Sequence, residues 1–329
     1  MKIAYDDVHV GFVCGSYEAV SAVISVFDTK SLMRRGRAAD RNIYTVGVIG
    51  EHAAASTLSL GSHRLIGTMI YMRNTFPNLR VMFVVNHATG VPDPGASPAR
   101  DIRLGDVVVG VPTEGNIAGV KVHGYDDGIT DLSLLKVPQQ ILLHAVDQVQ
   151  DNYGAQGANS ISAFIEDLLK KRPMLRDCGD DGNGYGRPEQ TSDRLFEADY
   201  SHIKDDFRSA KYCAKCDADQ EVQREERSHH NPVVHRGLIA TYSAEVEYGV
   251  LRDKIKSENG AICIEKDLFY VDAFFSPLLA IRGISNYGDS HKNPEWAMYA
   301  SLTAATFARH VLLAISPAQM ASEKRLVEY

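Results

Sequence analysis

The sequence predicts a layered α/β fold. Continuous apolar runs too short for helices, such as residues 79–85, are typical of strands buried in the middle of a sheet. Longer segments with apolar residues at helical spacing alternate with these runs. Such alternation is typical of a sheet whose faces are covered by helices. The chain has 329 residues, 44% of them apolar, so it can bury a substantial core.

In the first half of the chain, strands and helices alternate. Strands are predicted at 8–14, 43–49, 53–60, 79–85 and 107–111, and helices at 18–27 and 65–76. In the second of these helices the apolar residues lie mostly on one side. The run 79–85 should end at Asn86, and a loop rich in proline and glycine follows through Pro98.

The second half contains longer helices. They are predicted at 137–150, 161–171, 245–257 and 294–314, with a strand at 233–240. Pro294 stands at the start of the last helix, where proline is tolerated. Residues 173–231 are rich in Asp, Arg, Gly and His and show weak periodicity, so we expect a surface excursion within a single domain spanning 1–329.

Two apolar runs near the C-terminus end in polar residues. Glu265, Lys266 and Asp267 follow the run 261–264, and Asn286 follows the run that begins at Pro277. Polar groups at strand ends of an α/β sheet usually face the ligand crevice. These residues therefore predict the floor of an active site.

The charge balance limits the class of ligand. A formal charge of -7 and a pI near 5.9 give no general attraction for nucleic acid or an anionic membrane. A small molecule fits better. The N-terminus has no signal-peptide pattern and no apolar run has the length of a membrane span, so we expect a soluble, cytoplasmic protein.

The five cysteines (Cys14, Cys178, Cys213, Cys216 and Cys263) are an odd number, which suits a reducing compartment. Cys213 and Cys216 have the spacing of a zinc-binding pair, and His229 and His230 follow them. A structural zinc site needs four ligands, and no second pair stands at regular spacing. We therefore expect free thiols in a surface loop and no metal.

Several motifs are shared with a known family. They are Asp101-Ile102-Arg103-Leu104-Gly105-Asp106, Gly237-Leu238-Ile239-Ala240, Ile281-Arg282-Gly283-Ile284 and Asp289-Ser290-His291-Lys292-Asn293, with Asn286-Tyr287 and Trp296. Together they closely resemble the nucleoside phosphorylase superfamily, and within it the branch abundant in filamentous fungi. Asp193-Arg194-Leu195-Phe196 and the Cys213–Asp217 segment extend this resemblance into the excursion.

The resemblance implies a three-layer α/β/α fold around a mixed, partly barrel-like sheet. It also implies assembly as a homo-dimer, trimer or hexamer. The family cleaves the N-glycosidic bond of a nucleoside, with phosphate as co-substrate in phosphorylases and water in nucleosidases. No metal or organic cofactor is needed.

The ribose-binding motif of this branch is Glu-Met-Glu, and this chain has Glu265-Lys266-Asp267. The resemblance places Asp267 on the ribose and Lys266 where a Met would lie against the sugar. An alternative is that Lys266 extends to solvent and Asp267 caps the following helix.

Asn286 matches the Asp that protonates the leaving base in nucleosidases. A carboxamide donates and accepts hydrogen bonds but does not release a proton at neutral pH. General acid catalysis should therefore be lost here. One branch of purine phosphorylases has Asn near the purine ring, so a nucleoside ligand remains compatible.

Two turns expected at the substrate also differ from the family pattern. Residues 86–92 stand where the family has Gly-Ile-Gly-Gly-Gly-Val-Pro, and they place His87, Thr89 and Gly90 at the substrate. His87 is either a new acid or base or a packing histidine. Thr241 and Tyr242 lie in the second turn, where Tyr242 replaces a glycine and makes the pocket bulkier.

Glu18 matches the N-terminal Glu that activates water in nucleosidases; alternatively it is a helix N-terminal acid favoured by the macrodipole. Gly61 and Arg64 match the segment where the family binds phosphate, although an exposed arginine is the default for such a position.

Three functions are compatible with these residues. The first is an enzyme acting on the N-glycosidic bond of a nucleoside, with Asp267, Asn286, His87 and Glu18 as its catalytic groups. In the second, the fold serves another substrate, in a lyase, isomerase or cyclase step of fungal secondary metabolism. The third is a nucleoside-binding domain without catalysis.

Overall fold

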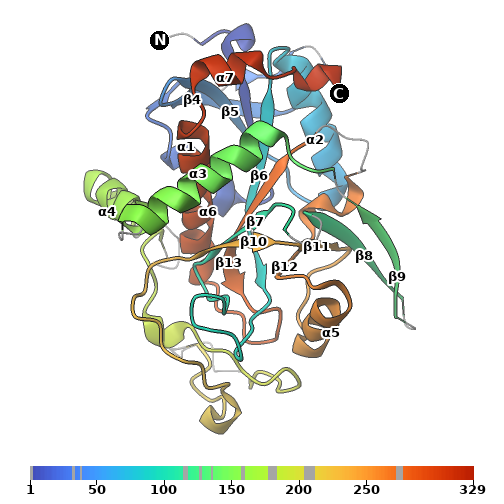
Figure 1. The fold of residues 1–329 in the computed structure, drawn as a ribbon, viewed down its shortest axis with the longest axis vertical. Coiled ribbons are helices and arrows are strands. Elements are labelled where there is room, and N and C mark those ends of the chain that lie inside the picture. Colours follow the sequence, from blue (N-terminus) through green and yellow to red (C-terminus); the bar gives the residue numbers. More distant parts are fainter. Residues whose placement is uncertain are drawn as a thin grey trace.

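A single long strand, β6 (Val81–Gly90), organises a mixed sheet with helices on both faces (Figure 1). The computed structural model describes residues 3–31, 34–37, 39–113, 118–125, 128–134, 136–156, 160–176, 184–203, 212–271 and 277–329. Cys178 lies outside the described residues. β6 pairs in parallel with β1 (Val10–Cys14) on one side and β13 (Leu279–Asn286) on the other.

The sheet is branched. Its main path runs β2-β4-β5-β1-β6-β12-β11-β8-β9; β13, β7 and β10 branch from β6, and β3 pairs with β4. The remaining strands are β2 (Thr29–Lys30), β3 (Arg34–Arg35), β4 (Ile43–Ile49), β5 (His52–Leu58), β7 (Val107–Gly110), β8 (Gly119–Tyr125), β9 (Gly128–Leu134), β10 (Val234–Gly237), β11 (Ile239–Tyr242) and β12 (Cys263–Glu265).

The branching arises because β6 is longer than its neighbour β1. Beyond Val85, where pairing with β1 ends, β6 continues beside β13, and its last residues pair antiparallel with β12. The prediction that β6 ends before Asn86 is therefore wrong. The sheet divides here into two arms, which gives the partly barrel-like mixed sheet that was expected.

Helices cover the two faces of this sheet. They are α1 (Tyr17–Ser25), α2 (Ser62–Thr75), α3 (Gln140–Gln156), α4 (Ser160–Lys171), α5 (Gly249–Asn259), α6 (Trp296–Leu313) and α7 (Pro317–Ser322). On β1, Gly11 faces Met72 of α2, whereas the next residue, Phe12, packs against Phe27 beside α1. Successive strand residues point to opposite faces, so α1 and α2 lie on opposite sides.

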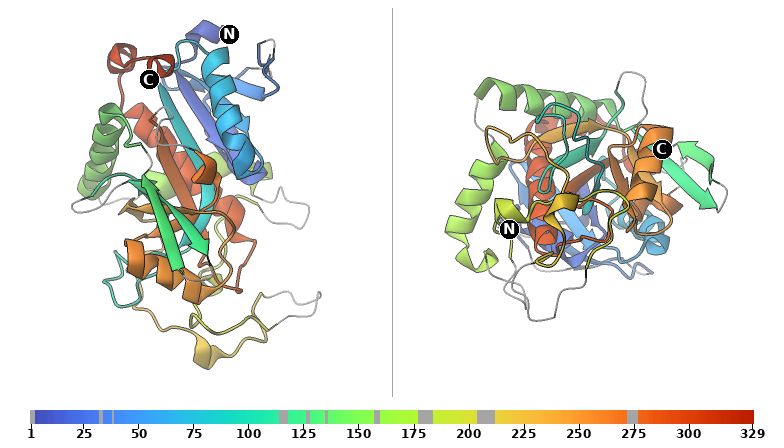
Figure 2. Two further views of the ribbon diagram at one scale, coloured as in Figure 1. Left: turned by 90° about the vertical axis from the view of Figure 1, so that its right-hand side faces the viewer. Right: turned by 90° about the horizontal axis from the view of Figure 1, so that it is seen from below.

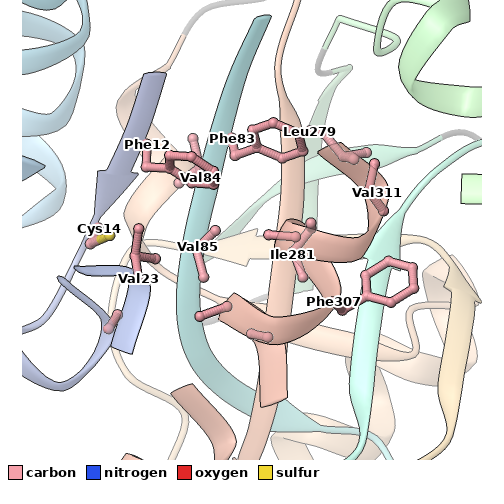
Figure 3. Packing of buried hydrophobic residues seen from close by; sticks show 14 of the residues in the cluster. Phe12, Cys14, Val23, Phe83, Val84, Val85, Leu279, Ile281, Phe307 and Val311 are labelled. Atoms are coloured by element: carbon pink, nitrogen blue, oxygen red, sulfur yellow. The ribbon is translucent and has the colours of Figure 1, made fainter. Parts of the chain in front are cut away.

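The core is continuous between the sheet and α6. Phe12 and Phe83 stack across β1 and β6 with ring centres 5.0 Å apart, and Phe307 and Val311 of α6 lie over Ile281 (Figure 3). α6 packs on both β13 and β6, with α1, α3 and α4 beside it. This packing fixes the direction in which β13 delivers its C-terminal residue, Asn286.

The excursion lies at the opposite end of the molecule from α7 and is yellow in Figure 1. In its described parts it contains short 3-10 helices (Pro173–Leu175, Gln190–Ser192 and Ala218–Gln220) and an isolated bridge between Phe196 and Glu221. Arg227 anchors it to the body by donating to Asp106. The single-domain organisation stays a prediction.

Some boundaries differ from those predicted from the sequence. The apolar segment 233–240 forms two strands, β10 and β11, which separate at Leu238, and α5 begins at Gly249 rather than at 245. The hairpin β8–β9, which projects from the molecule in Figure 2, was not predicted. Within the described residues no single helix has the length and apolarity of a membrane span; α6 qualifies only jointly with the bent segment Pro317–Glu328.

Candidate active site

A cavity of about 160 Å³ lies where the sheet divides, next to the N-terminus of α1. The ends of β6, β12 and β13 and the segment before α5 supply its walls. Its lining residues are Gly15, Ser16, Asn86, His87, Ala88, Thr89, Ala244, Glu245, Val246, Ile264, Glu265, Lys266, Asp267 and Asn286. The structure therefore brings Asp267, Asn286 and His87 into one cavity.

Asp267 turns its carboxylate to the cavity because another residue caps the short helix that follows. Glu265 accepts hydrogen bonds from the backbone N–H groups of Asp267 (2.9 Å) and Leu268 (3.2 Å) at the start of the 3-10 helix Asp267–Tyr270. Asp267 Oδ2 instead accepts a hydrogen bond from Asn86 Nδ2 at 2.7 Å. The alternative in which Asp267 acts only as a helix cap is wrong.

Arg282 lies beneath both carboxylates and is fully buried. Its Nη2 donates to Glu265 Oε2 at 2.8 Å and lies 3.9 Å from Asp267 Oδ2. Burial raises the pKa of Glu265, and the charge of Asp267 adds to this against the opposing effect of Arg282. Burial would lower the pKa of Arg282, but the two carboxylates outweigh it and raise that pKa. Two acids thus share one cation.

The amide of Asn286 is oriented so that its NH₂ group, rather than its oxygen, is available to a ligand in the cavity. The Oδ1 atom accepts hydrogen bonds from the backbone N–H of Gly288 (2.9 Å) and from Thr89 Oγ1 (2.8 Å). Because a backbone N–H only donates, this contact fixes the orientation of the amide. Nδ2 donates to Ser285 Oγ at 3.2 Å. Nδ2 carries two hydrogens, so the amide can also donate to a ligand.

His87 lines the same cavity as Asn286. Its Nδ1 is 3.0 Å from Ser285 Oγ, which links it to Asn286 through a shared hydroxyl. Burial lowers the pKa of His87, although Glu18, Asp267 and Glu245 oppose the shift. The imidazole is therefore neutral near pH 7 and can accept a proton.

Glu18 is the second residue of α1 and does not line the cavity. Ser16 caps this helix by accepting from the backbone N–H of Ala19 at 3.1 Å, and Ser16 itself lines the cavity. The Glu18 carboxylate lies near enough to raise the pKa of His87. The position agrees with the interpretation of Glu18 as a helix N-terminal acid.

Lys266 lies at the rim of the cavity. Its side chain is 51% exposed, and its Nζ lies 3.2 Å from Glu245 Oε2. Lys292 Nζ contacts the other oxygen of Glu245 at 2.7 Å. The Lys266 amino group thus reaches solvent, as the alternative for this residue proposed, and Glu245 becomes a cavity residue that the sequence did not indicate.

The other predicted site residues divide into two groups. Thr89 and Glu265 line the cavity. Thr241 is buried beside Glu265 in the β11–β12 pair, and neither it nor Tyr242 lines the cavity. Gly90 also lies outside the lining; a Cβ there would come within 2.6 Å of Ile284, so this glycine serves packing.

The predicted phosphate residues are not brought to this cavity. Gly61 is the N-cap of α2 with φ 85°, and Arg64 is exposed on the first turn of that helix. Neither residue is part of the cavity lining.

Sequence reasoning did not single out Asn86 or Gly15 as site residues. A Cβ on Gly15 would lie 2.5 Å from Asn86 Nδ2 and 2.6 Å from Asp267 Oδ2, so only glycine leaves room for this pair. Asn86 Oδ1 is buried and has no hydrogen-bond donor among the described residues. The signal for Asn86 was its position where the family has glycine.

A comparison with curated proteins finds a relative that is similar in sequence to this chain. It is described as a nucleotide-binding leucine-rich repeat (NLR)-like protein of Hyaloscypha variabilis, and it is 29% identical over 338 residues. The match covers 100% of this chain and 31% of that protein, so the chain spans about a third of the relative's length. No family model matches the chain.

Solved structures resemble it over nearly their whole length. Futalosine hydrolase of Helicobacter pylori has a TM-score of 0.54 at 12% identity and covers 93% of this chain and 97% of its own. The 5'-methylthioadenosine/S-adenosylhomocysteine nucleosidase of S. pneumoniae has a TM-score of 0.54 at 14% identity, covering 93% and 99%. The corresponding nucleosidase of Neisseria meningitidis has a TM-score of 0.52 at 11% identity, covering 92% and 98%.

At this level of identity the neighbours establish the fold alone. The similarity covers more than nine tenths of this chain and so includes the divided mixed sheet described above. The chain therefore has the fold of these nucleosidases and of futalosine hydrolase, which agrees with the fold that the resemblance implied.

Proposed function

We propose that this protein binds a nucleoside in the cavity and cleaves its N-glycosidic bond with water as the acceptor. The observation that carries the proposal is that Asp267 and Asn286, the residues suited to ribose and base, line one cavity. A site for a nucleoside needs a hydrogen-bond acceptor for the ribose hydroxyls and a hydrogen-bond donor for the base. These two groups must lie on opposite sides of the N-glycosidic bond. Its ribose would lie against Asp267 and its base against Asn286.

The side of the cavity assigned to the ribose offers a hydrogen-bond acceptor and negative charge. The carboxylate of Asp267 can accept a hydrogen bond from a sugar hydroxyl while it accepts one from Asn86 Nδ2. Glu265 and Asp267 share the single charge of Arg282, so the floor of the cavity is net negative when both are ionised. Negative charge favours a transition state with oxocarbenium character.

At the base end, Asn286 Nδ2 supplies a hydrogen bond but no proton. A hydrogen bond to a ring nitrogen or carbonyl stabilises the charge that develops on the leaving base. Because protonation by a general acid is missing at this position, we expect slow turnover.

Water is favoured over phosphate as the acceptor by the charges of the lining. Among the described residues that line the cavity, Lys266 is the only lysine or arginine. Its amino group contacts the carboxylate of Glu245. Phosphate would meet the carboxylates of Asp267 and Glu265, while Lys266 is already paired with Glu245 and Arg282 with the two carboxylates. Water needs only a base, and the neutral His87 imidazole can take its proton.

The test incubates the protein with inosine, adenosine, uridine or methylthioadenosine, with and without phosphate. Chromatography then measures the free base that is released. We expect release that does not depend on phosphate and falls at least about 100-fold in Asp267→Asn, the scale of losing one charge-stabilising group. Arg282 keeps Glu265 as its partner in this variant, so the fold should persist. Asp167→Asn, on the exposed surface of α4, is the matched control.

No base from any nucleoside would refute the cleavage proposal, as would an Asp267→Asn variant with full activity. The second candidate function is nucleoside binding without cleavage, and the carboxamide at Asn286 favours it. In that outcome nucleosides would still raise the melting temperature although no base is released. If neither base release nor stabilisation is seen, the cavity serves a substrate of another class.

A further inference from the structure

Three metal-ligating side chains meet within the excursion, away from the cavity described above. They are His202, Cys213 and Cys216, whose ligand atoms all lie within 4.8 Å of one another. Cys213 and Cys216 stand in one turn, in which the N–H of Cys216 donates to the carbonyl of Cys213. Both cysteines are buried, and no disulfide joins them.

A single nitrogen atom faces both sulfurs. His202 Nδ1 lies 3.4 Å from Cys213 Sγ and 3.3 Å from Cys216 Sγ. An imidazole nitrogen has either one proton or one lone pair, so it cannot form a full hydrogen bond with both thiols at once. A shared cation between the three atoms explains the convergence. In a tetrahedral zinc site the usual bond lengths set adjacent nitrogen and sulfur ligands about 3.5 Å apart.

A second histidine borders the same cluster. His291 is buried, and neither of its ring nitrogens has a hydrogen-bond partner among the described residues; Asp289 Oδ1 lies 3.9 Å from Nδ1, beyond hydrogen-bond distance. A buried polar atom without a partner costs on the order of 1–3 kcal/mol, so this ring needs an explanation. His291 and Cys213 also line one small cavity.

The two histidine rings lie close together, although the ring nitrogens of His291 fall outside the group of ligand atoms that all lie within 4.8 Å of one another. The ring centres of His202 and His291 are 5.4 Å apart and their planes are nearly perpendicular at 85°. Two imidazoles bound to one tetrahedral zinc have ring centres about 5 Å apart, from zinc–nitrogen bonds of ordinary length. Phe196 stacks on His291 with ring centres 4.1 Å apart and holds the ring beside the cluster.

We propose that His202, Cys213 and Cys216 form the core of a structural site for a zinc-class divalent cation, and that His291 completes it as the fourth ligand when its ring turns toward the three ligand atoms. Two thiolates and two imidazoles are a ligand set that suits zinc, and four protein ligands leave no open position for catalysis. The expectation of free thiols without metal is replaced by this proposal. His229 and His230, the histidines that follow the two cysteines in the sequence, are exposed and are not among the ligands.

The site would join the excursion to the segment that follows Asn286. The backbone N–H of His202 already donates to Ser290 Oγ at 2.8 Å, next to His291. Arg194 holds the cysteine turn by donating to the carbonyl of Cys213 at 3.0 Å. Cys213, His291 and Asn286 line one small cavity, so a metal bound here would hold the excursion against the segment that contains Asn286.

The test is the metal content of the full chain purified without chelator. We expect about one zinc per chain in the wild type and in His230→Gln, a matched surface histidine variant. Cys216→Ser should lose the metal, and His291→Gln should bind it more weakly. Cobalt exchanged into the site should show thiolate charge-transfer absorption, and in His291→Gln the ligand-field bands should change while the charge transfer remains.

A second measurement covers variants that fail to fold. Zinc added to wild-type protein stripped by a chelator should raise its melting temperature by about 5 °C or more. A wild type that holds no zinc and gains no stability from it would overturn the proposal. Equal zinc content in Cys216→Ser and His230→Gln would also overturn it. Neither readout uses a nucleoside, so the result is independent of the proposed function.

Discussion

The carboxamide of Asn286 can donate a hydrogen bond to a leaving base but cannot protonate it. The contacts around this side chain show that a carboxylate could take its place with few other changes. Its Oδ1 is engaged by Gly288 N–H and Thr89 Oγ1, and its Nδ2 stands beside Ser285 Oγ. A carboxylate has the same shape and could keep both contacts to Oδ1. The loss of acid function is therefore confined to one atom.

Asn286→Asp should raise the rate of base release by at least about tenfold, the lower part of the range for general acid catalysis. The new oxygen would replace Nδ2 at the cavity and carry a proton to the leaving base. Single-turnover base release from the best substrate measures this directly. An unchanged or lower rate would show that the cavity is remodelled beyond this residue.

Residues at the ends of apolar runs were predictable from the sequence, and their partners were not. Asp267 and His87 follow such runs, which marks them as crevice residues. Arg282 stands inside an apolar strand, and only the fold shows that it lies under Glu265. The capping role went to Glu265 rather than Asp267 because helix caps depend on local geometry that residue type alone does not fix.

At the scale of elements, the contact between β13 and α6 positions the site. A Cβ on Gly283 would lie 1.8 Å from the carbonyl oxygen of Ala300, which belongs to the helix backbone and cannot rotate away. The close approach of α6 to β13 therefore requires glycine at this position.

Gly283→Ala should destabilise the protein by at least about 3 kcal/mol, because the helix must move away from the sheet. Gly67→Ala in α2 is the matched control, since no atom lies within 4 Å of the added Cβ. It should stabilise by about 0.5–1 kcal/mol. Urea unfolding midpoints measure both, and a Gly283→Ala variant as stable as the wild type would contradict this packing.

The interface of α3, α4 and α6 contains a histidine that should couple stability to pH. Burial, with a smaller effect of Arg309, lowers the pKa of His310 to about 4. Tyr153 Oη lies 2.6 Å from its Nδ1, and Phe164 packs edge-on at 5.7 Å. The ring is therefore neutral in the folded protein at neutral pH.

As pH falls from about 6.5 to about 4, the unfolded chain binds a proton at this position and the folded protein does not. Stability contributed by neutral His310 is thus present above pH 6.5 and lost on acidification, by up to about 3 kcal/mol. The free energy of unfolding of His310→Gln, measured against pH, should show a correspondingly shallower decline. Parallel curves for the two proteins would show that His310 titrates normally.

Element types were predicted better than their limits. The run 79–85 gave β6 its identity, but residues 86–90 continue as strand because β13 and β12 pair with them, and those partners are distant in sequence. Likewise 233–240 forms two strands because β10 joins β7 while β11 joins β12 and β8. Boundaries set by long-range pairing are not encoded in local pattern.

At the scale of the whole molecule, the division of the sheet creates the cavity. One arm delivers Asp267 after β12 and the other delivers Asn286 at the end of β13, so the two residues meet only if both arms form. The α/β class followed from alternating runs, and the divided sheet followed from the resemblance. The predicted homo-oligomer stays a prediction.

The most direct measurement is the melting temperature of the wild type, Asp267→Asn and the Asp167→Asn control with saturating inosine, adenosine, uridine and methylthioadenosine. At least one nucleoside should raise the melting temperature of the wild type and of the control, and should leave that of Asp267→Asn unchanged. If no nucleoside stabilises the wild type, or if Asp267→Asn gains as much as the wild type, Asp267 and Asn286 do not form a nucleoside site.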